Sequence, residues 1–161
     1  MNFKLKSRPK TSLFKFFIGA LFLAVLVAGC VSNQDKTSLD NFSKLQTFHL
    51  QFIDTYTQDA TASKQWNATQ FEADVATGNV LFVTALATEQ GKPTPDPTRM
   101  KAFQLLQDQF QSDCGLLRQK AASGTPFFSM AFSQNLKKIV QANYELALKG
   151  EVSRVQKGGD N

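Results

Sequence analysis

Apolar residues recur at alternating spacings of three and four along four segments of the chain, and the residues that break helices fall between these segments. This period matches the turn of an α-helix, so the apolar side chains of each segment share one face. The pattern predicts four amphipathic helices. Their expected core positions are Phe42, Leu45, His49, Phe52 and Tyr56; Phe71, Val75, Gly78, Phe82 and Ala85; Phe103, Leu106, Phe110, Cys114, Leu117 and Ala121; and Phe128, Phe132, Leu136, Ile139, Asn143 and Leu146.

Polar residues that can bond the free N–H groups at a helix start precede these segments. Trp66 also lies where it can pack onto Phe71, as a hydrophobic staple does at the entry to a helix. Glycines at 91, 124 and 150 mark the expected ends of the last three helices. The expected caps are Thr37 with Asp40, Asn67 with Gln70, Asp96 before Pro97, and Thr125 before Pro126.

Short connections between long helices favour antiparallel neighbours. We therefore expect an all-α fold in which residues 37–150 form an up-down four-helix bundle. An elongated coiled coil fits less well, because the breaks recur every thirty residues or so. The polar residues 151–161 are expected to form a flexible tail.

The distribution of charge excludes one class of function. Residues 1–29 contain five of the 18 Lys and Arg residues and no acid. From Cys30 onward, thirteen basic residues face thirteen acidic ones, so the net charge of this part is zero. A nucleic-acid binder needs a surplus of basic side chains to neutralise phosphates, and we expect no such partner.

The N-terminal residues have the pattern of a secretory signal peptide. A basic stretch precedes thirteen uncharged, mostly apolar residues at 16–28, which are followed by Gly29 and Cys30. A membrane-spanning helix needs roughly 20 apolar residues, so a cleaved signal is favoured over a transmembrane anchor.

The sequence Leu26-Val27-Ala28-Gly29-Cys30 resembles the lipobox of bacterial lipoproteins. The resemblance implies that residues 1–29 are removed and that Cys30 carries a diacylglycerol on its thiol and a further acyl chain, such as palmitate, on its new N-terminus. Acyl chains of this kind hold a protein on a membrane. The residue after the modified cysteine is Val31 rather than Asp. By the sorting pattern of this family, that residue implies the outer membrane if the host is Gram-negative. Residues 30–36 would then be the lipidated cysteine and a short polar tether.

His49, the only histidine in the chain, occupies a core position of the first helix. One interpretation makes it a haem or metal ligand in the bundle interior, with Met100 or Met130 as a partner. The favoured one is a buried imidazole bonded to a single neighbour, because no Glu-x-x-His or Cys-x-x-Cys motif accompanies it. The expected neighbours are Tyr56, Asp74 and Asn143.

Other residues that could carry chemistry have simpler expected roles. Cys114 fits a small buried apolar residue, since Cys30 would be acylated and no disulfide would remain possible. Asp74 and Asp113 could face a groove as a carboxylate pair, but solvated or capping roles are favoured. We expect Gly78 and Gly115 to allow close approach of neighbouring helices.

Trp66 and the pair Phe127-Phe128 lie beside predicted helix starts. We expect these aromatic side chains to close the core at the ends of the helices. They are also the first place to look for a surface that docks a partner.

These features predict a lipid-anchored protein of the bacterial cell envelope, at the periplasmic face of the outer membrane or at the cell surface. We expect it to be non-enzymatic and to serve as an interaction or accessory subunit of an envelope assembly. The alternative is a carrier that holds a small molecule, haem or metal in the bundle. An enzyme using Asp74, His49 or Cys114 is the least favoured hypothesis.

Overall fold

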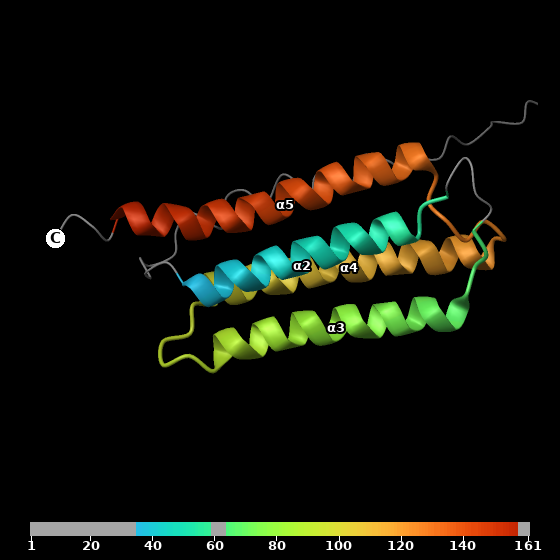
Figure 1. The fold of residues 1–161 in the computed structure, drawn as a ribbon. Coiled ribbons are helices and arrows are strands. Elements are labelled where there is room, and N and C mark those ends of the chain that lie inside the picture. The colour runs from blue at the N-terminus through green and yellow to red at the C-terminus, as the bar shows by residue number, and fades with distance from the viewer. Residues whose placement is uncertain (1–34, 59–63, 158–161) are drawn as a thin grey trace, which may run out of the picture. The chain divides into compact units, whose positions relative to one another are not determined.

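A computed structural model describes residues 35–58 and 64–157 of the 161-residue chain. The leader and Cys30 lie outside this part. In the described ranges the chain forms α2 (Lys36–Thr55), α3 (Ala68–Gln90), α4 (Pro97–Ala122) and α5 (Met130–Lys157). Consecutive helices run in opposite directions and lie side by side (Figure 1). The expected all-α, up-down four-helix bundle is confirmed.

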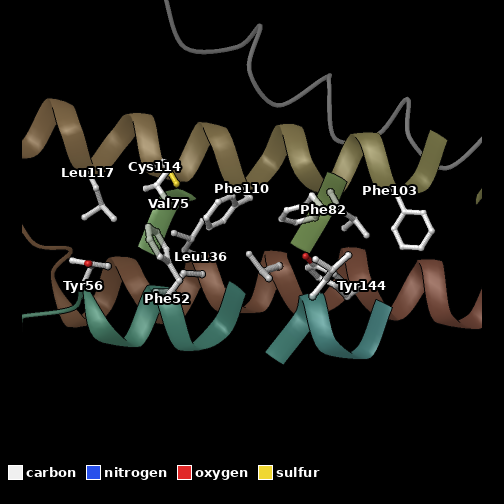
Figure 2. Packing of buried hydrophobic residues seen from close by; sticks show 14 of the residues in the cluster. Phe52, Tyr56, Val75, Phe82, Phe103, Phe110, Cys114, Leu117, Leu136 and Tyr144 are labelled. Atoms are coloured by element: carbon white, nitrogen blue, oxygen red, sulfur yellow. The ribbon is translucent and has the colours of Figure 1, made fainter. Parts of the chain in front are cut away.

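Side chains from all four helices meet in one aromatic core (Figure 2). The rings of Phe42 and Phe103 stack with their centroids 4.2 Å apart, and those of Phe52 and Phe110 meet edge to face at 5.0 Å. Burying a side chain of this size contributes roughly 1.5–3 kcal/mol. The helices are not equally spaced, because α2 packs closely against both α5 and α3, whereas α4 makes few contacts with α5.

Two glycines in the helices have different surroundings. A Cβ atom added at Gly78 would lie 2.5 Å from Phe110 Cζ and 2.7 Å from Phe48 Cε1. Close approach therefore requires glycine there, as predicted. A Cβ added at Gly115 would meet no atom within 4 Å, so the same prediction for Gly115 is wrong.

The caps of α3 and α4 are confirmed. Asn67 Oδ1 accepts a hydrogen bond from the Gln70 backbone N–H at 3.0 Å, and the Trp66 and Phe71 rings lie 5.0 Å apart. Asp96 accepts from the backbone of Thr98, with Pro97 in the first turn.

The predicted start of the first helix is wrong. Asp35, not Thr37 with Asp40, caps α2, and its carboxylate accepts from the Thr37 backbone N–H at 2.9 Å. The helix therefore begins at Lys36, inside the region that we expected to be tether.

The expected start of the fourth helix at Thr125-Pro126 is also wrong. The backbone N–H of Phe128 donates to the carbonyl of Tyr56 at 2.9 Å, and the N–H of Gln58 donates to the carbonyl of Phe128 at 2.8 Å. These long-range bonds hold Phe128 outside the helix, so α5 begins only at Met130.

The other end of α5 departs from expectation as well. The helix passes Gly150 and continues to Lys157, so the predicted flexible tail over 151–161 is wrong for 151–157. Glu151 is 2% exposed and accepts a hydrogen bond from Arg99 Nε at 2.7 Å. This buried contact with α4 favours continued helix beyond the glycine.

The face that α5 turns to the core differs from the predicted one. Phe132 and Ile139 are 41% and 54% exposed, whereas Val140 and Tyr144 are fully buried. Of the predicted positions within the helix, Leu136 is the buried one. The helix is therefore rotated relative to the expected stripe.

Candidate functional site

The structure joins His49 of α2 and Asp113 of α4 at the centre of the bundle. His49 Nε2 lies 2.9 Å from Asp113 Oδ2, and both residues are buried. The expected imidazole bonded to one neighbour is found, but none of the three expected neighbours is that residue. The solvated or capping role expected for Asp113 is wrong. Its place between Phe110 and Leu117, at spacings of three and four, puts it on the apolar face, and this signal could have revealed it.

Aromatic rings surround this central pair. The His49 ring meets the Phe110 ring at 5.3 Å and the Tyr144 ring at 6.0 Å, both edge to face. A carboxylate that accepts a hydrogen bond at Nε2 requires a proton on that nitrogen. Among the described atoms, neither Nδ1 nor the Tyr144 hydroxyl has a hydrogen-bond partner. Burial and the nearby Asp113 raise the pKa of Tyr144, which keeps its hydroxyl neutral.

The two methionines considered as ligands lie near helix starts. Met130 opens α5 and is 47% exposed, and Met100 lies in the first turn of α4. The bond that His49 makes is to Asp113 instead. Over residues 35–58 and 64–157, no three His, Cys, Asp or Glu side chains are grouped to hold a metal ion.

Cys114 is fully buried, as predicted, and burial raises the pKa of its thiol to about 12. Asp74 is half-buried and accepts hydrogen bonds from the Tyr56 hydroxyl at 2.7 Å and from Gln70 Nε2 at 2.8 Å. Asp74 and Asp113 thus bond to different partners.

A second buried polar cluster lies where α3 meets α4, beside the start of α2 and the end of α5. We call it the end network; it comprises Asp35, Ser38, Glu89, Lys92, Asp96, Arg99 and Glu151. Glu89 is 1% exposed and accepts from Ser38 Oγ at 2.9 Å and from the Asp96 backbone N–H at 3.0 Å. Lys92 bonds both Glu89 and Asp35.

Arg99 extends the end network to α5. Its Nε donates to Glu151 at 2.7 Å, and its Nη1 lies 3.7 Å from Glu89 Oε1. All four helices are thus linked at this end. This cluster was not predicted from the sequence, although Glu89 follows Phe82 and Ala85 at helical spacing on the core face.

The charge state of Asp35 follows from its partners. Partial burial by itself would raise the pKa of its carboxyl, but the hydrogen bonds from Lys92 and from the Thr37 backbone N–H outweigh that effect. The pKa of Asp35 is therefore lowered.

Aromatic side chains close the opposite end of the bundle, as expected. Phe128 is fully buried, and Trp66 lies against Tyr56 and Phe127 with ring centroids 5.8 and 5.9 Å apart. These rings belong largely to the core.

In the part of the chain that the structure describes, none of the helices combines the length and the apolar character needed to cross a membrane. No known protein-family model, curated protein or solved structure matches this chain.

Proposed function

We propose that this chain is a bacterial lipoprotein whose helical bundle is anchored to the cell envelope through Cys30 and acts as an interaction or accessory subunit. The observation that carries the anchor is the Leu26–Cys30 sequence at the end of a signal-type leader. The acyl chains attached there would bind the membrane through their buried methylenes, each worth about 0.8 kcal/mol.

The beginning of the bundle supports this proposal. Only four residues separate Cys30 from Asp35. An extended chain spans at most about 3.6 Å per residue, so an acylated Cys30 would lie within roughly 18 Å of the start of α2. The end network fixes that start through Asp35 and Lys92. An anchored domain would thus have its α3–α4 end near the bilayer.

An interaction role is supported by what the bundle exposes and what it buries. The titratable pair His49 and Asp113 lies inside, where a dissolved substrate has no contact with it. Large apolar side chains instead lie on the outside, namely Val80, Val83, Leu116, Met130, Phe132, Ile139 and Val152. Exposed apolar side chains of this kind, when grouped, mark sites where another protein binds.

The anchor is tested by labelling full-length protein with a palmitate analogue in a bacterial host. The wild type should take up label and sediment with membranes, and Cys30→Ser should do neither. Cys114→Ser is the matched control, because Cys114 is buried and should leave labelling unchanged. Label retained by Cys30→Ser would refute the anchor.

The accessory role is tested by crosslinking intact envelopes and capturing the full-length protein. A stoichiometric partner protein supports the proposal. A protein recovered alone with a bound small molecule, haem or metal would replace it with the carrier hypothesis.

A further inference from the structure

The four helices form two closely packed pairs. Helix α2 packs most extensively against α5, and α3 against α4, whereas contacts between helices of different pairs are less extensive. Each pair is also joined by an ion pair near its surface. Lys137 Nζ of α5 lies 2.7 Å from Asp54 Oδ1 of α2. Arg118 Nη2 of α4 lies 2.7 Å from Glu72 Oε2 of α3. The bundle therefore consists of two halves, which we call the α2–α5 pair and the α3–α4 pair.

The chain passes from one pair to the other at one end of the bundle. The α2–α3 and α4–α5 connections lie at the end where α2 and α4 finish, which we call the connected end (Figure 1). Two backbone hydrogen bonds tie these connections together. The Phe128 N–H donates to the Tyr56 carbonyl at 2.9 Å, and the Gln58 N–H donates to the Phe128 carbonyl at 2.8 Å. At the opposite end, the described backbone has no such link between the pairs, because the α3–α4 turn lies within one pair.

Side chains of the end network join the two pairs at that opposite end. Ser38 Oγ of α2 donates to Glu89 Oε2 of α3 at 2.9 Å. Arg99 Nε of α4 donates to Glu151 Oε1 of α5 at 2.7 Å. All four residues are buried. Closure of the bundle at this end therefore depends on hydrogen bonds between buried polar and charged groups.

The two ends would expose different surfaces if the pairs separated. At the end network, separation returns carboxylates and a guanidinium group to water, and their hydration offsets much of the attraction that is lost. At the connected end, separation exposes the fully buried Phe128 and the rings of Tyr56 and Trp66. Hydration of such apolar surface is unfavourable. Separation should therefore begin at the end network.

We propose that the end network is a latch between the two pairs. When its hydrogen bonds break, the α3–α4 pair swings away from the α2–α5 pair about the connected end, and the helices within each pair stay packed. Hinge motions of this kind start from regions of low local stability. The stacked rings of Phe42 and Phe103 lie one turn beyond Ser38 and Arg99. The open form presents these two rings, which the closed bundle buries.

Labelling of buried thiols compares opening at the two ends. The natural Cys114 is fully buried in the half of α4 near the connected end. Ala85→Cys adds a thiol on α3 at a buried position, one turn before Glu89 and on the same face. The full-length variant in detergent is treated with a thiol reagent, and mass spectrometry of its peptides gives each rate relative to that in unfolded protein. Position 85 should react roughly tenfold faster than position 114, because opening of the latch exposes it without global unfolding.

Variants of the latch separate local opening from a loss of overall stability. Arg99→Met should speed labelling at position 85 by a larger factor than at position 114, whereas lower overall stability by itself speeds both equally. Ser38→Ala removes one hydrogen bond of the latch and should act in the same direction by a smaller factor, so it decides the matter if Arg99→Met does not fold. The matched control Arg118→Met removes an ion pair within the α3–α4 pair and should leave the rate at position 85 unchanged.

A second probe checks that Ala85→Cys does not itself loosen the core. Ala102 is buried on α4, three residues after Arg99 and on the side that bonds α5. The thiol of Ala102→Cys should also react faster than Cys114 and should respond to Ser38→Ala in the same way. A fast thiol at position 85 with a slow one at position 102 would contradict the movement of α3 and α4 as one pair.

Equal rates at positions 85 and 114, or equal acceleration of both by Ser38→Ala, would overturn the latch, because the bundle would then open as a whole. Faster labelling at position 114 would refute it as well and would place the opening at the connected end. The comparison does not require an acylated Cys30, because each thiol is read from its own peptide. A protein without palmitate label can therefore still have the latch, and a lipidated protein can lack it.

Discussion

The centre of the bundle and its α3–α4 end both bury charged side chains, but they differ in how fully those side chains are hydrogen-bonded. At the centre, Asp113 bonds His49, and the nearby Nδ1 and Tyr144 hydroxyl have no partner among the described atoms. In the end network, Glu89 receives bonds from a hydroxyl, a backbone N–H and an ammonium group. We therefore expect the two sites to respond differently to the loss of one member.

A buried ion pair is costly to break because the remaining charge stays in a medium of low dielectric constant. The number of groups that depend on the lost partner then sets the size of the effect. In the end network, one Arg serves two buried carboxylates, whereas at the centre one His serves one. The end network should therefore be the more sensitive region.

The largest effect is expected from Arg99→Met. This substitution keeps most of the side-chain volume but removes the positive charge beside Glu89 and Glu151, so unfolding should be easier by about 3–5 kcal/mol. Chemical denaturation followed by circular dichroism measures it. The control Arg118→Met removes an exposed pair with Glu72 and should cost less than about 1 kcal/mol. If the two variants lose the same free energy of unfolding, then burial does not increase the contribution of the end network to stability.

A smaller effect is expected from His49→Phe. It leaves the Asp113 carboxyl buried without its hydrogen bond, at a cost of about 2 kcal/mol. Adding Asp113→Leu should recover most of that loss, because the double variant removes both polar groups. Denaturation of the two variants provides the measurement. If the double variant is no more stable than His49→Phe, then His49 and Asp113 do not form an isolated pair. Loss of a bound chromophore or metal in either variant would favour the carrier hypothesis.

The smallest effect is expected from Asp35→Asn, which keeps a good helix cap but removes a charge that is partly exposed to water. The loss at neutral pH should stay below about 1 kcal/mol. Because the pKa of Asp35 is lower in the folded protein than its ordinary value of 3.8, the ionised carboxylate stabilises the fold above that pH. The stabilisation is lost as the pH falls through the folded pKa. The difference between wild type and variant should therefore vanish in acid, and a difference that grew below pH 3.8 would contradict this assignment.

Much of the fold could be predicted from the sequence where local signals and packing agree. For α3, the cap at Asn67 and the staple of Trp66 on Phe71 follow from residues near in sequence. For α5, the local signals at Pro126 and Gly150 were overridden. The backbone of Phe128 pairs with residues of the α2–α3 connection, and Glu151 bonds Arg99.

The candidate sites were harder to predict for a related reason. His49 was identified from its position on an apolar stripe, and Cys114 was correctly expected to be buried. Asp113 and Glu89 also occupy core positions, but a charged residue there is recognised as buried only when its partner is known. Asp113 bonds His49, 64 residues away in sequence, and Glu89 bonds Ser38, 51 residues away, in addition to the nearer Lys92 and Asp96. Periodicity places a residue on a face but does not pair it with a distant one.

The helical period, the four helices of the described part, their antiparallel order and the caps of α3 and α4 could be predicted from the sequence, because these depend on residues close together along the chain. The sequence also carries the lipobox resemblance on which the proposed anchor depends. The face of α5 that enters the core, the residues at which that helix begins and ends, and the pairing of the buried charges were set by packing between the helices. Those features depend on the fit of side chains and backbone groups from separate helices, and the free energy of that fit exceeds the local preferences of a proline or a glycine.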